Sequence, residues 1–168
     1  MSTQQWLLSD FDDEIASTRR FLERVPDDRL AWRPHPASAT FGELASHIAE
    51  LPGWTRAALK QDARDYPAEN GGGREPIQLD SVPDILSFFD QNCVDGRRII
   101  QDTTDEELAR SWNLAGSHGP LFTGTKAAVF RRMVLRHLVH HRGQLSVYLR
   151  LVGVPVPPAY GPTADAPG

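Results

Sequence analysis

Residues 137–144 read HLVHHRGQ and lie inside a longer stretch, residues 125–152, whose spacing predicts one helix. At about 100° per residue, His141 falls at the centre of the apolar stripe of this helix and His137 at its edge. Two imidazoles one turn apart therefore face a predicted core, where polar groups need partners. The same spacing offers two nitrogen ligands to one metal ion. The pair alone allows either a metal site or two hydrogen-bonded core histidines.

The neighbouring polar residues of this helix fall on different sides of it. His140 is also one turn from His137, but its angle places it off the apolar stripe, so His141 is the preferred second ligand. Gln144 faces the side of the histidines, where it could orient an imidazole. The remaining side is predicted to be a solvated face that carries Arg131, Arg132, Arg142 and Arg150.

A second histidine-bearing helix is predicted upstream, with an apolar stripe that includes His47. Thr40 and Glu43 form a capping-box pattern at its start. Glu43 also lies one turn before His47, so it could orient that imidazole, although the capping role is the preferred interpretation. Pro52 should kink this helix, or else the helix ends at Leu51 and restarts.

Two more amphipathic helices are predicted, at about residues 2–25 and 81–103. Long connections without periodicity follow the second and third helices, at residues 61–80 and 104–124, and the first of them is long enough to cross over the bundle. Four helices without a strand pattern predict an all-α four-helix bundle over residues 1–153. A proline-rich tail, residues 154–168, is predicted to pack on the bundle or trail from it.

The other chemically notable side chains are predicted to have structural or solvated roles. His35 lies between two prolines and His118 beside glycine and proline, so both are predicted to be loop residues. Cys93 falls on an apolar helix face and is predicted to be a small buried hydrophobe rather than a nucleophile.

Composition excludes several classes of protein. The chain has 168 residues, enough for one domain with a core, and a net charge of −4, which gives no reason to expect a nucleic-acid partner. One cysteine cannot form an intrachain disulfide, which fits a reducing cytoplasm. The sequence has neither a membrane-spanning apolar run nor a signal-peptide pattern. We therefore expect a cytoplasmic protein without a membrane partner.

Three core-facing histidines, His47, His137 and His141, are thus available on two facing helices. Three imidazoles would leave a coordination position open for water or substrate, as in catalytic metal sites. Zinc is the default ion for such ligands, with nickel and other divalent ions as alternatives. No other side chain recommends itself as a general base, so the catalytic residues stay unassigned and the metal would supply most of the chemistry.

The sequence resembles the DinB-like family of DNA-damage-inducible bacterial proteins over nearly its whole length. The matching motifs are AWRP at residues 31–34, FGELASHI at 41–48, LPGW at 51–54, HLVHHRGQ at 137–144 and GVPVPPAYG at 153–161. This resemblance implies a four-helix bundle with up-up-down-down connectivity, assembled as a homodimer. It also implies a divalent metal ion held by His47, His137 and His141, the residues that the helical angles select.

For function, the resemblance implies a stress-response role but no DNA binding. Related members include S-transferases that use bacillithiol or glutathione, and mycothiol-dependent maleylpyruvate isomerases. The first hypothesis is therefore a metal-dependent thiol S-transferase, in which the metal ionises the thiol of a low-molecular-weight cosubstrate. Two alternatives remain: a metal-binding stress-response protein without turnover, and a metal-dependent hydrolase.

Overall fold

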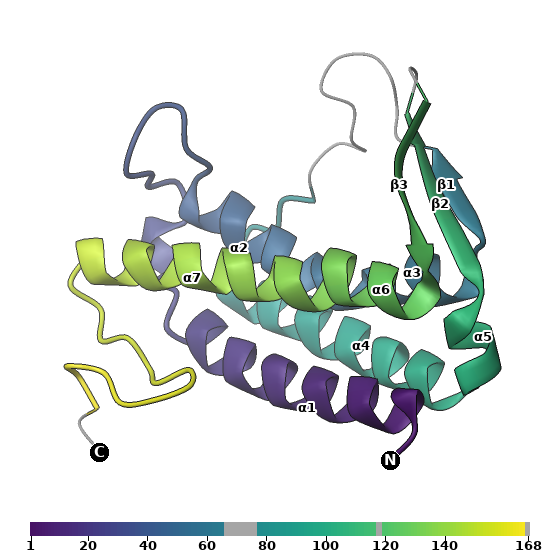
Figure 1. Cartoon of the computed structure of the whole chain (residues 1–168). Helices are drawn as coiled ribbons and strands as arrows, with labels where there is room; N and C mark the ends of the chain where they lie inside the picture. The colour runs from purple at the N-terminus through teal and green to yellow at the C-terminus, as the bar shows by residue number, and fades with distance from the viewer. Residues whose placement is uncertain (66–76, 117–118, 167–168) are drawn as a thin grey trace.

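A computed structural model describes residues 1–65, 77–116 and 119–166 of the chain. Four helical segments pack along one another and confirm the predicted four-helix bundle (Figure 1). They are α1 (Thr3–Leu22), α2 (Phe41–Glu50) continued by α3 (Thr55–Lys60), α4 (Val82–Gln101), and α6 (Lys126–Phe130) continued by α7 (Arg136–Leu151).

Hydroxyl side chains begin these segments. Each one accepts a hydrogen bond from the backbone N–H three residues later, which satisfies one of the free donors of the first turn. These N-caps are Ser2, Thr40, Ser81 and Thr125. The capping box of α2 is present, because the backbone N–H of Thr40 also donates to the Glu43 carboxylate at 2.6 Å. At the other end of α7, Gly153 adopts a φ of 76°, a conformation that favours glycine.

The helix directions follow from contacts between the segments. α1 and α4 are antiparallel, because Arg19 pairs with Asp90 and the later Arg97 pairs with the earlier Asp12. α1 and α7 run the same way. α2 and α4 are also parallel to each other, as the long connection between them permits.

The order of directions is therefore up, down, down, up, rather than the expected up-up-down-down (Figure 1). The difference arises because residues 23–40, which contain the short 3₁₀ helix η1 (Asp27–Arg29), reverse the chain between α1 and α2. Among consecutive described segments, α2–α3 and α4 are the pair that runs in the same direction.

Pro52 does not kink a continuous helix. Instead α2 ends at Glu50, and the 3₁₀ turn η2 (Leu51–Trp54) links it to α3. α4 packs closely against this turn, since a Cβ on Gly96 would lie 2.9 Å from the carbonyl oxygen of Pro52. The Asn92 amide of α4 also donates to the carbonyl of Ala49 at 2.9 Å. These contacts fix the end of α2, which carries His47.

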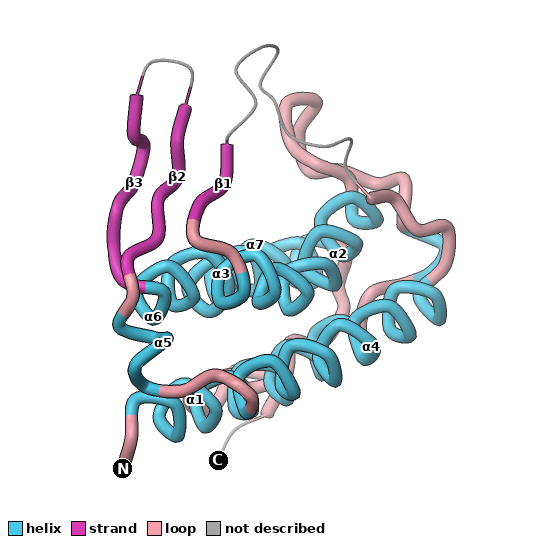
Figure 2. Tube along the Cα trace, turned by 90° about the vertical axis from the view of Figure 1, so that its right-hand side faces the viewer, coloured by secondary structure: helices cyan, strands magenta, loops and turns pink. Residues whose placement is uncertain are grey.

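A small sheet stands at one end of the bundle (Figure 2), so the expectation that the chain has no strands is wrong. β2 (Ser111–Gly116) pairs antiparallel with β3 (Gly119–Thr125) and parallel with the short β1 (Ala63–Asp65). β2, β3 and the short helix α5 (Asp105–Ala109) occupy much of residues 104–124, which were predicted to be a loop. Trp112 is fully buried and its indole N–H donates to the carbonyl of Ala57, which attaches the sheet to α3. His118 lies outside the described residues.

The buried side chains form a core that runs the length of the bundle, and Cys93 lies within it as predicted. The part of the C-terminal tail that the structure describes, residues 154–166, turns back beside α7 and α1 (Figure 1), and Val156 packs into the core.

Arg142 is 2% exposed, so its assignment to a solvated face is wrong. The side of α7 opposite the histidines is covered by α1 and the tail. None of the helices that the structure describes is long and apolar enough to cross a membrane.

Candidate metal centre

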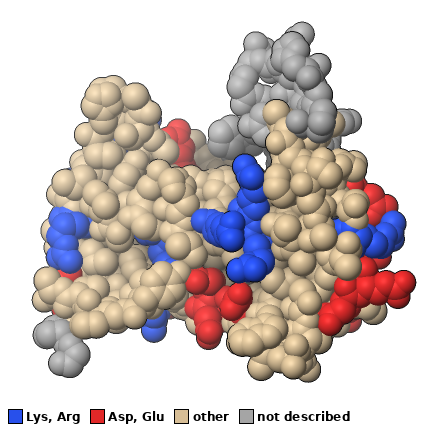
Figure 3. All heavy atoms as spheres, in the orientation of Figure 1, with Lys and Arg blue, Asp and Glu red and all other residues tan. Residues whose placement is uncertain are grey.

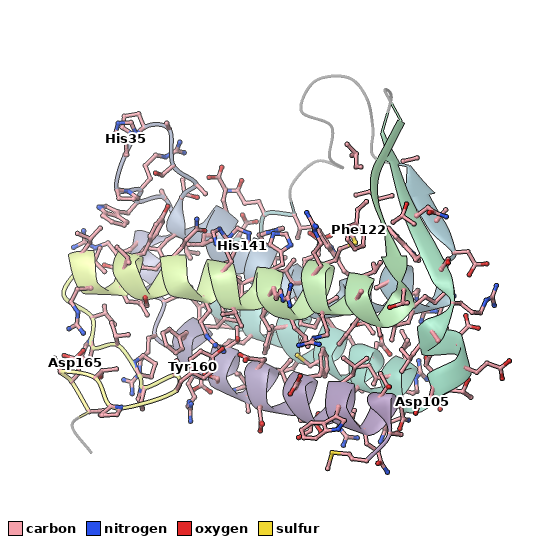
Figure 4. All side chains as sticks on the ribbon, viewed as in Figure 1. His35, Asp105, Phe122, His141, Tyr160 and Asp165 are labelled. Atoms are coloured by element: carbon pink, nitrogen blue, oxygen red, sulfur yellow. The ribbon has the colours of Figure 1, made fainter. Side chains whose placement is uncertain are left out.

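The structure brings His47 of α2 together with His137 and His141 of α7. All three are partly exposed, and one ligand atom from each lies within 4.8 Å of the others. The ring centroids are 5.1 Å apart for His47 and His137, 4.7 Å for His47 and His141, and 4.6 Å for His137 and His141. Figure 4 shows His141 projecting from α7 on the side where α2 lies. The helical spacing therefore placed these residues on the correct faces.

The two facing nitrogens suit a shared metal ion better than a hydrogen bond. The Nε2 atoms of His47 and His137 are 3.4 Å apart. This is long for a hydrogen bond, since the usual N–H···O distance is about 2.9–3.0 Å. Two imidazoles bound tetrahedrally at about 2.0–2.1 Å from zinc have nitrogens about 3.3–3.4 Å apart. The residues present thus fit a divalent metal ion.

Hydrogen bonds orient the two imidazoles of α7, one to the Gln144 side chain and one to the backbone of Met133. The Nδ1 of His141 lies 2.7 Å from the Oε1 of Gln144, an acceptor, so this nitrogen carries the proton and leaves Nε2 free. His137 bonds to the backbone of Met133, one turn earlier. Gln144 therefore lies within hydrogen-bond distance of His141. The Glu43 carboxylate instead caps α2.

A π-helical turn, residues Arg131–Leu135, joins α6 to α7 just before His137. The sequence instead predicted one uninterrupted helix over residues 125–152. Here the N–H of Arg136 bonds to the carbonyl of Arg131, five residues earlier. Such a turn releases a backbone carbonyl from the ordinary helical pattern and often occurs at functional sites. Met133, whose backbone forms a hydrogen bond with His137, belongs to this turn. No glycine or proline marks the turn in the sequence, so periodicity could not reveal it.

Trp54 is a second feature that the sequence argument did not assign to the site. Its indole meets the rings of His47 and His137 nearly edge-on, with centroids 5.7 Å and 5.4 Å away. It forms an aromatic wall beside the histidines. His140 is exposed and does not join the cluster, although its ring lies 4.9 Å from that of His141. His35 lies in an exposed loop away from the site, as predicted (Figure 4).

The site keeps its imidazoles neutral. Burial, followed by repulsion from the neighbouring imidazoles, lowers the pKa of His47 from 6.5 to about 4. Burial and the proximity of His141 likewise lower the pKa of His137 to about 4. Burial also lowers the pKa of His141. Neutral imidazoles present the lone pairs that a metal ion needs.

These shifts predict that acid destabilises the metal-free protein in a defined window. In the unfolded chain these histidines titrate near pH 6.5, so between pH 6.5 and about 4 the unfolded state binds more protons. Stability therefore falls as the pH is lowered through this window, by about 1–2 kcal/mol per histidine after solvent screening. Urea unfolding in the presence of a chelator should show this slope. His47→Gln should flatten it, whereas the control His35→Gln should not; equal slopes in all three proteins would contradict the prediction.

The sequence model of the DinB family matches residues 1–167 of the chain. The chain belongs to the DinB family. The uncharacterized protein YrdA of Bacillus subtilis (strain 168) is 25% identical over 167 residues, which cover 97% of this chain and 91% of YrdA. A DinB-like protein from Bacillus cereus ATCC 10987 has a similar crystal structure, with a TM-score of 0.72 and 21% identity over 91% of this chain and 95% of that one.

A further structural relative is YfiT from Bacillus subtilis, described as a probable metal-dependent hydrolase with an unusual four-helix bundle topology. It matches with a TM-score of 0.63 and 13% identity, over 89% of this chain and 87% of YfiT. At such identities the likeness establishes the fold. The arrangement of the three histidines is a property of this chain's own structure.

Proposed function

We propose that this protein is a metal-dependent enzyme whose divalent ion, zinc or nickel, is held by His47, His137 and His141. The observation that carries the proposal is the cluster of three neutral imidazoles, two of whose Nε2 atoms lie 3.4 Å apart. Among the described residues, no carboxylate or thiol joins this cluster. Three protein ligands leave a position open, which is the arrangement of catalytic rather than structural sites.

Within this class, we favour a thiol S-transferase that takes a low-molecular-weight thiol of the mycothiol or bacillithiol type. A divalent ion lowers the pKa of a thiol or water that occupies its open position. The protein's own thiol cannot serve as the nucleophile, because Cys93 is buried in the core and burial raises its pKa. The nucleophilic sulfur would therefore arrive with a cosubstrate. Trp54 would shield one side of the reacting group from water.

Hydrolysis of a small substrate is the second candidate. The same open position would take a water molecule in place of a thiol. The likeness of the fold to YfiT, described as a probable metal-dependent hydrolase, favours this candidate.

An assay with two substrates separates these candidates. Metal-loaded protein is incubated with 1-chloro-2,4-dinitrobenzene and mycothiol, bacillithiol or glutathione, and separately with p-nitrophenyl acetate without thiol. An S-transferase should form the thioether, with release of chloride, in a reaction that a chelator and His137→Ala both abolish. His140→Ala should retain it. Ester hydrolysis without thiol would instead identify a hydrolase, and inactivity of the loaded protein in both assays would favour a metal-binding protein without turnover.

A further inference from the structure

Three arginines lie where α6 passes into α7, and within the described part of the chain none of them has a carboxylate partner. They are Arg131, Arg132 and Arg136, and all three are exposed. Further along α7, by contrast, Arg142 pairs with Glu14 and Arg150 with Asp165. Figure 3 shows Lys and Arg side chains gathered over the start of α7. This end of the helix therefore carries uncompensated positive charge next to the histidines.

The π-turn changes the angle between one of these arginines and the histidines. Arg132 precedes His137 by five residues, and the π-turn Arg131–Leu135 lies between them, so the angle between these two residues about the helix axis is smaller than in an uninterrupted α-helix. Arg131 lies on another side, where it lines a pocket against α1 with Trp6 and Leu7. An uninterrupted α-helix would place a residue five positions earlier well off the face of His137.

Phe122 of β3 holds the Arg132 side chain. The guanidinium carbon of Arg132 lies 4.8 Å from the centre of the Phe122 ring. Phe122 and His141 project on the same side of the α6–α7 segment (Figure 4). Stacking on a ring uses the face of the guanidinium and leaves its N–H donors at the edge free. The β-hairpin thus holds a free donor edge on the side of the α6–α7 segment from which His141 projects.

We propose that Arg132 binds a carboxylate of the molecule that occupies the open position at the histidine cluster, and that it selects anionic substrates. The inference rests on the proposed function, because it requires that position to accept a substrate. A planar guanidinium matches a carboxylate with two parallel hydrogen bonds, which is the strongest pairing that its donors can make. Arg132 is thus a specificity-determining residue, and the small sheet has a role in substrate selection.

A pair of thiols that differ in charge tests the proposal. Protein loaded with cobalt(II), a spectroscopic substitute for zinc, is titrated with 3-mercaptopropionate and with its neutral analogue 3-mercaptopropionamide, and thiol binding is followed by the visible absorption of the cobalt. We expect the carboxylate to bind about tenfold more tightly than the amide, as one charge-assisted pairing provides. Arg132→Gln should reduce this ratio to about one to two without changing the dissociation constant of the amide. The control Arg131→Gln should keep the original ratio.

Each contrary result has a distinct meaning. If Arg132→Gln keeps the tenfold preference, or if the unmodified protein binds both thiols equally, Arg132 does not select the anion and the proposal fails while the open position stands. If neither thiol changes the cobalt spectrum, the site has no position open to a thiol, and the proposed S-transferase fails together with the inference.

Discussion

Replacing His141 by alanine should abolish retention of a divalent metal ion, whereas His140→Ala should leave it unchanged. His141 supplies one of three clustered imidazoles, and His140 beside it is exposed and outside the cluster. Loss of an outer hydrogen bond to a ligand already weakens metal binding about 10–100-fold, so loss of a ligand itself should weaken it further. Metal content is measured by mass spectrometry on untagged protein, and affinity by competition with a chelator. The unmodified protein should hold about one ion per chain, the number that one three-histidine cluster can bind.

The adjacent pair His140 and His141 controls for effects on folding and surface charge. Because His141 is partly exposed, the alanine variant should fold, which thermal unfolding in the presence of a chelator would verify. Equal loss of metal from both variants would show that the cluster is not the binding site. Absence of metal from the unmodified protein, with no uptake of added zinc or nickel, would mean that the three histidines are satisfied by hydrogen bonds alone.

Periodicity located the histidine cluster because helical angle determines which side chains can meet. His47, His137 and His141 each fall on or beside an apolar stripe, and α2 and α7 bring those stripes together. Periodicity could not locate the π-turn at Arg131–Leu135, since one extra residue in a turn leaves the local composition unremarkable. Arg132 is exposed, as predicted for a solvated face, and periodicity could not show that its guanidinium lies against Phe122.

The sheet was missed for a different reason. β2 and β3 do contain the alternating residues of a hairpin, with Trp112 buried and Phe122 half-buried, but the sequence between them is not a standard two-residue turn signal. β1 has three residues, and each of them pairs with a residue of β2 that lies fifty positions later, as Ala63 does with Asn113. Such long-range pairing depends on how α3 is packed, which no local pattern encodes.

Arg142 illustrates why angle alone does not predict exposure. It lies on the side of α7 opposite the metal centre, where α1 and the C-terminal tail cover it. Its guanidinium lies 2.7 Å from the Glu14 carboxylate and donates to the hydroxyl oxygens of Thr18 at 3.2 Å and Tyr160 at 2.5 Å. The Tyr160 hydroxyl in turn donates to Glu14 at 2.7 Å. This network joins α7, α1 and the tail.

Arg142→Met should therefore be among the most destabilising single changes, because it leaves the Glu14 carboxylate half-buried without its cation. Removing one partner of a buried ion pair costs about 3–5 kcal/mol. The matched control is Arg150→Met on the same helix, whose side chain is 51% exposed and pairs with Asp165. An exposed pair contributes about 0–1 kcal/mol, so this variant should remain close to the unmodified protein. Urea unfolding at pH 7 measures both, and similar small losses in the two variants would contradict the role of Arg142.

A double variant distinguishes the lost charge pair from lost packing. Glu14→Gln combined with Arg142→Met removes both charges, so its loss of stability should be smaller than the sum of the single losses by at least about 1 kcal/mol. Tyr160→Phe tests the contribution of the tail, because it removes only the hydroxyl that bridges the two charges. If the network holds the tail against the bundle, this variant should also increase proteolytic cleavage within residues 154–166 while leaving metal retention intact. Additive losses in the double variant would mean that Arg142 stabilises the fold through packing of its aliphatic stem alone.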